Sequence, residues 1–397
     1  MAISKISGLK NVREKLLGYK LISVSRLTGI RLARLQALEA DEGPPTVFEA
    51  EELSRVYGID ADLLADRPIR LSAKDVVQVF TDLDEFREVG DFEKVKIIEA
   101  ANAARDVYEL ELLAGKQPNL PLPRIGYGSN APPYQQGAEI AVKLRRRLGL
   151  ETGPISSVRD LFRDRLPTVT LLYACLGREG PAALALADAH RPATIVLNME
   201  GKNENPCVRR FSLAHELCHL VADWKPRQPL AILSGYYSDT ALAQEQRANA
   251  FAVRFLCPQS ELTSLPGKPL DAATQMMRGY GLHYSAARLY LFNERNAKLP
   301  DQPIDETTVS ASIDHKWEEA EAPNGIFDFP LSAVPPERRT RVAILAASLY
   351  SRGQILRDRF AELLRLTPAD ELEKVLDFFD LNPPDSAAGT QGETNLS

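Results

Sequence analysis

The spacing of apolar residues near the N-terminus predicts a small unit built only of helices. Residues 8–65 contain short runs with helical periodicity, interrupted by Gly and Pro at turn-like points. Between about residues 73 and 114 the apolar positions continue through two long amphipathic stretches with few helix breakers. We therefore predict an all-helical domain over residues 1–68, followed by a helical connector over residues 69–115.

The pattern changes in the middle of the chain. Residues 116–136 are rich in Pro, Gly and Asn and lack apolar periodicity, which predicts a linker between domains. Two later runs, Thr168–Ala174 and Ala193–Asn198, have the composition of strands, and helical patterns surround them. The sequence thus predicts a second domain of the α+β type over residues 137–298.

The last quarter of the chain gives less information. Residues 299–380 predict a helical C-terminal region, to which the sequence assigns no role. Residues 381–397 have a composition typical of disorder. The expected fold is therefore multi-domain and mainly α, with an α+β domain between the N-terminal helices and the C-terminal region.

Composition excludes several classes of protein. The chain has 397 residues, 44% of them hydrophobic, which is enough for more than one core. No apolar run approaches the roughly 18 residues of a membrane span, and the N-terminus lacks the apolar core of a signal peptide. The four cysteines are widely spaced and form no CxxC pair, so disulfides and a cysteine zinc knuckle are not expected. These features predict a cytoplasmic protein without a membrane partner.

The charge is distributed unevenly. The net charge is −6, but residues 1–35 contain eight Lys or Arg residues and a single Glu. A basic segment attached to an acidic remainder favours an anionic partner at the N-terminal end. Charge therefore adds nucleic acid to the candidate partners of the N-terminal domain.

Candidate chemistry is concentrated in the run FSLAHELCHLVADW, in which His215 and His219 are four residues apart. On a helix this spacing puts both rings on one face, where two nitrogens can reach one ion. Glu216 beside them can hydrogen-bond a metal-bound water and take its proton. The run predicts a zinc site in which Glu216 is the catalytic base.

Catalytic zinc has three protein ligands and an open fourth position, so a third ligand is expected downstream. Glu245 is the preferred candidate because it lies on a predicted helix and shares a face with Asn249. An amide in this place can hold a ligand histidine through its free ring nitrogen. Three alternative ligands remain open: Asp239, Glu261 and His283.

The zinc motif and its surroundings resemble the ImmA/IrrE family of metallopeptidases. The resemblance is carried by the runs RFSLAHELCHL, EQRANAFA and LCP, by the ATIVLN strand and by the YGLHYSAARL segment, and it spans about residues 137–295. It implies that His215, His219 and Glu245 bind zinc, with Glu216 as the base. Two positions depart from the family: Cys218 replaces a usual glycine and Cys257 a usual methionine.

The N-terminal pattern fits a helix-turn-helix, with Gly29 at the turn and with Leu35 and Leu38 facing inward. It resembles the XRE/Cro-type domain, although Leu21 and Ile22 stand where that family often has a polar, phosphate-contacting residue. The recognition-helix face that could meet DNA carries three polar residues: Arg31, Arg34 and Gln36.

Together these features predict a zinc peptidase attached to a DNA-binding domain. By resemblance, its substrate would be a repressor or antitoxin, cleaved under stress to release transcription. Candidate oxyanion or substrate contacts are Arg210, Tyr236 and Tyr237. Two other functions stay open: a transcription regulator that senses metal or ligand without cleavage, and an antitoxin-like interaction protein. A homodimer is compatible with all three.

Overall fold

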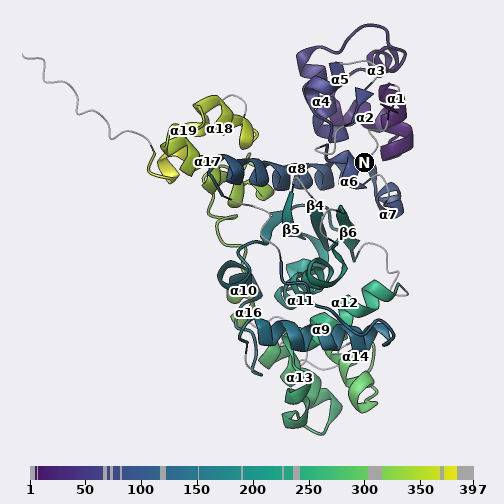
Figure 1. Cartoon of the computed structure of the whole chain (residues 1–397), viewed down its shortest axis with the longest axis vertical. Helices are drawn as coiled ribbons and strands as arrows, with labels where there is room; N and C mark the ends of the chain where they lie inside the picture. Colours follow the sequence, from purple (N-terminus) through teal and green to yellow (C-terminus); the bar gives the residue numbers. More distant parts are fainter. Residues whose placement is uncertain are drawn as a thin grey trace, which may run out of the picture.

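The computed structural model describes residues 5–6, 8–65, 69–71, 75–80, 83–116, 122–150, 152–188, 191–225, 228–235, 242–302, 315–366 and 371–381. Figure 1 shows the long helix α8 (Asp91–Leu113) running between the N-terminal helices and a small sheet. The helices within residues 133–295 lie on the other side of that sheet, and the C-terminal helices lie beside α8. Within the described parts of the chain, no helix is long and apolar enough to cross a membrane.

The N-terminal part is all-helical, as predicted, apart from one short strand pair. Its elements are β1 (Lys5–Ile6), α1 (Leu9–Asn11), the π-helix η1 (Val12–Leu17), α2 (Leu21–Thr28), α3 (Leu32–Glu39), α4 (Val47–Tyr57), α5 (Ala61–Ala65), β2 (Ile69–Arg70), α6 (Val77–Phe80) and α7 (Asp84–Glu88). β1 and β2 pair antiparallel. Gly29 ends α2 with φ 71°, a left-handed conformation that glycine adopts without a steric cost, so the chain can turn into α3. Leu35 and Leu38 are buried, as the pattern predicted.

The sheet has four strands in the order β3-β5-β4-β6. Its strands are β3 (Thr170–Ala174), β4 (Ala183–Asp188), β5 (Arg191–Asn198) and β6 (Leu230–Ser234). β3 runs parallel to β5, whereas β4 is antiparallel to both β5 and β6. Every residue of β5 is buried, because helices cover both faces of the sheet. The two predicted strands correspond to β3 and β5, and β4 and β6 were not predicted.

Helices within residues 133–295 pack on one face of the sheet. They are α9 (Pro133–Arg147), α10 (Val158–Arg165), η2 (Gly201–Glu204), α11 (Pro206–Cys218), η3 (His219–Asp223), α12 (Ala243–Leu256), η4 (Gln259–Ser264), α13 (Pro269–Tyr280) and α14 (Tyr284–Arg295). Residues of β4 and β5 that face this side, such as Ala185 and Ile195, share a core with α11 and α12. This core positions the histidine helix against the sheet.

Helices from both the N-terminal and the C-terminal parts of the chain pack on the other face of the sheet. Leu184 and Val196 on this face share a core with α8, with the N-terminal helices and with the C-terminal helices. The C-terminal elements are α16 (His315–Ala320), η5 (Pro336–Arg338), α17 (Arg341–Ser351), α18 (Arg357–Leu363) and α19 (Leu372–Phe378). The predicted connector and C-terminal region are therefore not independent units, because they close one side of the sheet.

The predicted linker also differs from expectation in its described part. Within residues 122–136, Leu122 and Ile125 are buried against the sheet-side helices. The backbone N–H of Ile125 donates to the carbonyl of Val221 at 3.0 Å, just beyond the histidine helix. Proline and glycine here mark an irregular segment packed on the domain rather than a free linker.

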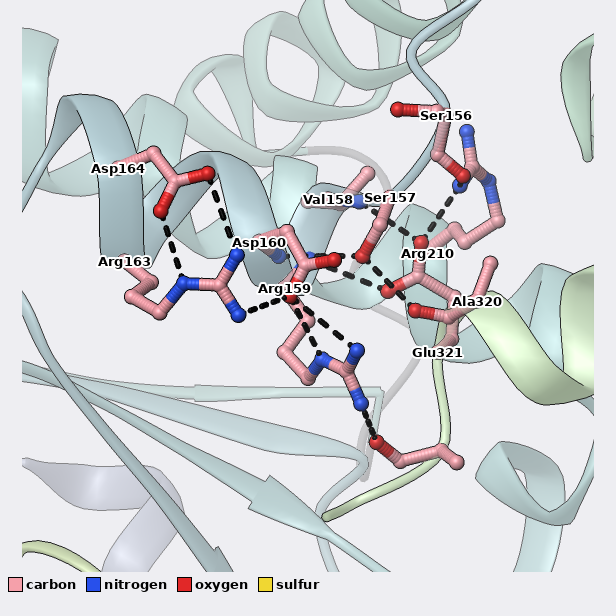
Figure 2. Close-up of polar contacts among 11 residues, drawn as sticks. Ser156, Ser157, Val158, Arg159, Asp160, Arg163, Asp164, Arg210, Ala320 and Glu321 are labelled. Atoms are coloured by element: carbon pink, nitrogen blue, oxygen red, sulfur yellow. Dashed lines mark hydrogen bonds and ion pairs between the residues drawn. The ribbon is translucent and has the colours of Figure 1, made fainter.

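Residues 315–322, which we call the clasp, fasten the C-terminal part to the sheet-side helices. Glu321 accepts hydrogen bonds from the backbone N–H groups of Val158 and Arg159 at 2.7 and 3.2 Å, at the start of α10 (Figure 2). It also pairs with the guanidinium of Arg210 on α11 at 2.5 Å. Trp317 is fully buried, and the carbon of the same guanidinium lies 4.0 Å from the centre of the Trp317 ring.

Candidate metal centre

The histidine helix is fixed at its beginning by a side-chain cap. Asn205 accepts a hydrogen bond from the backbone N–H of Cys207 at 2.8 Å, and Pro206 occupies the first helical position, where no N–H is needed. The chain continues through His219 as the π-helical turn η3. His215, Glu216 and His219 are all buried on this continuous stretch. The local sequence therefore places the motif rigidly inside the domain.

The structure brings His215, His219 and Glu245 together. One potential ligand atom from each lies within 4.8 Å of the other two. The Nε2 atoms of the histidines are 3.1 Å apart, and the Glu245 oxygens lie 3.1 and 3.3 Å from His215 and His219. Two imidazoles and a carboxylate are the ligand types of catalytic zinc. Among the described residues, this is the one such cluster of His, Cys, Asp and Glu.

Both histidines are held through their other ring nitrogen. Nδ1 of His215 lies 3.1 Å from the amide oxygen of Asn249, the partner expected from the sequence. Nδ1 of His219 lies 2.8 Å from Asp223, which the sequence analysis did not identify. These contacts leave both Nε2 atoms directed at the cluster, as metal ligation requires. The signal for Asp223 was present in the sequence, because it follows His219 by four residues.

A chain of contacts extends from Asp223 into the surrounding helices. Arg247, on α12 between Glu245 and Asn249, pairs with Asp223. Its other guanidinium nitrogen donates to the side chain of Gln136 at 2.9 Å. A carboxylate that contacts both a histidine and an arginine is held in one orientation. We therefore add Asp223 and Arg247 to the residues that orient the candidate ligands.

In the absence of a metal ion, the histidines and Glu245 strongly affect each other's pKa. Burial lowers the pKa of His219, but hydrogen bonds to Asp223 and Glu245 outweigh this effect and raise the pKa to about 10. Burial raises the pKa of Glu245, but the two histidines outweigh it and hold the pKa well below its usual range. Without a metal ion, His219 therefore favours its protonated form beside the ionised carboxylate of Glu245. Metal binding must displace this proton.

Glu216 is the buried carboxylate of the site. It is fully buried, and neither of its oxygens makes a hydrogen bond of standard geometry among the described residues, although the Ser234 hydroxyl is near enough to lower its pKa. Burial raises its pKa, and the two neighbouring histidines oppose this rise. A buried carboxylate without partners is costly unless a ligand completes its hydrogen bonds. Water held at the cluster would supply that partner, so the residues present fit a metal with an open coordination position.

Replacing Asp223 with asparagine is expected to lower zinc affinity by about 10- to 100-fold, because Asn accepts less strongly from His219 and no longer balances Arg247. Competition with a zinc chelator measures this affinity. Asp164→Asn, which removes an exposed carboxylate on α10, serves as the control and should leave affinity unchanged. Equal affinities for wild-type and Asp223→Asn proteins would show that this contact does not support the site.

Two alternative third ligands lie elsewhere. Glu261 accepts a hydrogen bond from the hydroxyl of Tyr280 at 2.7 Å. His283 caps the start of α14 and packs against Phe211, 4.9 Å between ring centres, and burial lowers its pKa to about 4. Neither belongs to the cluster of potential ligands. The third alternative, Asp239, lies outside the described residues.

Arg210, the one candidate oxyanion or substrate contact among the described residues, does not lie beside the candidate ligands. Arg210 does not line the site: it is fully buried, pairs with Glu321 and donates to the carbonyl of Ile155 at 2.7 Å. Five residues before His215, it projects from another face of α11. Its role is structural, which corrects the prediction. Tyr236 and Tyr237 lie outside the described residues.

The two cysteines that depart from the family pattern are buried thiols. Cys218 and Cys257 are both inaccessible to solvent and belong to the core on the sheet-side face. Burial raises the pKa of both thiols, to about 12 for Cys257. Both therefore remain protonated packing residues, and Cys218 is not a reactive thiol next to a ligand.

The three predicted DNA contacts are not equivalent in the structure. Arg31 directly precedes α3 without capping it, and both Arg31 and Gln36 are exposed. Arg34 is instead engaged within the domain, with its Nε 2.9 Å from Glu49 and its Nη2 donating to the carbonyl of Pro44 at 2.8 Å. Glu49 also completes a capping box with Thr46 at the start of α4. Arg34 thus joins α3 to α4.

Comparison with known protein families gives two matches. The IrrE N-terminal-like domain, a metallopeptidase family, matches residues 181–291, which include the whole candidate metal centre. The helix-turn-helix family matches residues 9–64, which include α2 and α3. Searches of curated proteins and of solved structures gave no match. The chain therefore combines an N-terminal helix-turn-helix domain with an IrrE N-terminal-like peptidase domain, the architecture that the sequence resemblance implied.

Proposed function

We propose that this protein is a zinc-dependent endopeptidase that regulates transcription by cleaving a repressor or antitoxin. The observation that carries the proposal is the convergence of His215, His219 and Glu245 beside the buried carboxylate of Glu216. The attached helix-turn-helix domain supports a regulatory rather than a digestive role. A stress-dependent release of transcription follows from the resemblance to the ImmA/IrrE family.

In this proposal each residue has a separate task. His215, His219 and Glu245 would hold zinc, which when bound supplies a Lewis acid that polarises the scissile carbonyl and makes water easier to deprotonate. Glu216 accepts the proton of the attacking water and returns it to the leaving amine. Its raised pKa suits both steps, because the protonated carboxyl is then an accessible state. Asn249 and Asp223 keep the imidazoles oriented.

The direct test uses the full chain. The purified protein is expected to contain one zinc per molecule and, when co-expressed with helix-turn-helix or antitoxin proteins encoded beside it, to cut one of them at a single site. Mass spectrometry identifies the cleavage site. A zinc-loaded protein that leaves all of these proteins intact would favour the sensing regulator.

We infer that the helix-turn-helix domain binds DNA through the exposed part of its recognition helix. Arg31→Gln is expected to weaken binding to the protein's own promoter and to lower the salt dependence by about one ion, because one phosphate contact is lost. Arg34→Gln should weaken binding less, since Glu49 already engages this guanidinium. Fluorescence anisotropy at several salt concentrations distinguishes the two. Equal losses would contradict this assignment, and no binding at all would favour an interaction module.

A further inference from the structure

An open, positively charged hollow lies on the surface of α9. It has a volume of about 460 Å³ and is lined by residues 124–127, which precede α9, and by Lys143 and Arg147 on the helix itself. Among the described residues, its lining contains three cations, Arg124, Lys143 and Arg147, and no carboxylate. We call it the α9 hollow. Figure 1 places α9 below the sheet, on the side away from the N-terminal helices.

The charge around the α9 hollow is opposite in sign to that of the whole chain. Residues 122–150 contain five Lys or Arg residues and a single acidic residue, Glu139, whereas the net charge of the protein is −6. Glu139 is already engaged, because Lys143 pairs with it at 2.6 Å. Arg124 and Arg147 are exposed, and neither pairs with a carboxylate of the described residues. An excess of positive charge therefore remains at the hollow.

Helix stability does not explain why Lys143 and Arg147 share one face of α9. They are four residues apart, and like charges at this spacing destabilise a helix. Basic residues near the end of a helix do interact favourably with the helix dipole, but Arg145 and Arg146 already supply that interaction in the last turn. An anion held between Lys143 and Arg147 would replace their repulsion by two attractive contacts.

Hydrogen bonds hold the two walls of the α9 hollow together. Nζ of Lys143 donates to the carbonyl of Gly126 at 2.7 Å, which joins the helix to the segment before it. The same segment is fixed to the domain where the backbone N–H of Ile125 donates to the carbonyl of Val221 at 3.0 Å. Arg124, next to Ile125, is thus attached to a fixed backbone. A site formed in advance loses less conformational entropy when it binds a partner.

The α9 hollow adjoins the candidate metal centre through Tyr127. This residue lines the hollow, and the guanidinium carbon of Arg247 lies 4.9 Å from the centre of its ring. Arg247 pairs with Asp223, which in turn contacts His219. Three side-chain contacts therefore connect the hollow to a candidate zinc ligand. A protein interface buries about 800 Å² of each partner, so a protein held at the metal centre also covers surface around it.

We propose that the α9 hollow binds an acidic segment, rich in Asp or Glu, of the protein that the peptidase cleaves. The identity of this partner rests on the proposed function, whereas the preference for an acidic peptide rests on the charges alone. Arginine binds carboxylates through paired hydrogen bonds, so Arg124 and Arg147 suit Asp and Glu side chains. Nucleic acid fits less well, because the cations gather in one hollow rather than in a groove that follows successive phosphates.

The first test is fluorescence anisotropy of labelled deca-glutamate with the full-length, zinc-loaded protein at low ionic strength. Deca-glutamate is expected to bind, whereas a neutral Gly-Ser peptide of the same length is not, and added salt should weaken the binding. Arg124→Gln combined with Arg147→Gln should weaken it about fivefold, as expected for the loss of two exposed ion pairs. Arg163→Gln combined with Arg178→Gln is the matched control, because it removes two exposed arginines outside the hollow and should have little effect.

The second test uses cleavage of the co-expressed partner and separates this proposal from the proposed function. The variant with both Arg124→Gln and Arg147→Gln should have a KM raised about fivefold and an unchanged kcat, because these side chains hold the substrate away from the reacting atoms. If the wild-type protein cleaves no partner, the proposed function fails, and the assignment of the partner fails with it. The anisotropy result still decides whether the hollow binds acidic peptides.

Other results would overturn the proposal directly. Equal deca-glutamate binding by the hollow variant and its control would show that the hollow does not hold the peptide, and a loss in Arg31→Gln instead would place it on the recognition helix. Tighter binding of an oligothymidylate of the same length would indicate a nucleic-acid site. Weaker deca-glutamate binding with an unchanged KM would show that the acidic ligand is not the substrate. Melting curves establish that each variant is folded.

Discussion

Glu216→Gln protein is expected to bind zinc with wild-type stoichiometry and to cleave its partner about 10²- to 10⁴-fold more slowly. The amide has nearly the shape of the carboxyl group, so the buried position stays filled. It cannot accept a proton from water, however, and no other carboxylate among the described residues is both buried and beside the two histidines without being a candidate ligand. Zinc content by mass spectrometry and cleavage by quantitative immunoblot measure the two properties separately.

Controls decide how this result is read. Glu204→Gln removes an exposed carboxylate on η2 and should leave both properties unchanged. If the variant loses both zinc binding and cleavage activity, Glu216 is needed to bind the metal, and its role as the proton acceptor is not supported. Unchanged cleavage by Glu216→Gln protein would reject the peptidase mechanism, and a sensing role for the zinc domain would then be preferred.

Removing the clasp carboxylate should have the largest effect on stability. Glu321→Ala is expected to lower the free energy of unfolding by about 3–5 kcal/mol, because it leaves Arg210 buried and unpaired. Both side chains of this pair are almost completely buried. The two backbone N–H groups at the start of α10 also lose their acceptor. Chemical denaturation of the full chain measures the change.

An exposed pair provides the comparison. Arg178 and Glu204 are 2.7 Å apart, but both are more than half exposed, so Glu204→Ala should cost less than about 1 kcal/mol. A double variant, Arg210→Leu with Glu321→Leu, removes both charges and should be more stable than Glu321→Ala alone. Similar losses for Glu321→Ala and Glu204→Ala would mean that the clasp is not a stabilising element.

The candidate site was largely predictable because its signals are local. His215 and His219 face the same way through helical spacing alone, and Asn249 follows from the same rule on the next helix. Arg210 was misassigned because proximity in sequence to His215 says nothing about which face of α11 it occupies. Its partner Glu321 is 111 residues away, and no local pattern connects the two. The role of Arg247 likewise depends on packing between α9 and α12.

The fold was likewise predictable where the sequence signal is local, and not where it depends on contacts between distant residues. β3 and β5 were predicted because their apolar, β-branched runs are bounded by polar residues. β4 has the sequence ALALAD, and alanine and leucine favour helix as readily as strand, so only pairing with β5 and β6 makes it a strand. The amphipathic pattern of α8 identified a helix correctly. It could not show that the helix packs on a sheet encoded about 60 residues later, because periodicity gives a buried face without naming its partner.

The position of α8 bears on how the protein is made in the cell. Its buried face contacts strands that are synthesised later, and its Asp106 pairs with Arg338, which the ribosome adds more than 200 residues afterwards. Domains normally complete their folding in order as they are synthesised. Here the apolar surface of α8 and of the N-terminal helices stays uncovered until the C-terminal helices have been synthesised. A truncated product would therefore expose apolar surface and be open to degradation, so that the molecules that persist would carry both the helix-turn-helix domain and the peptidase domain.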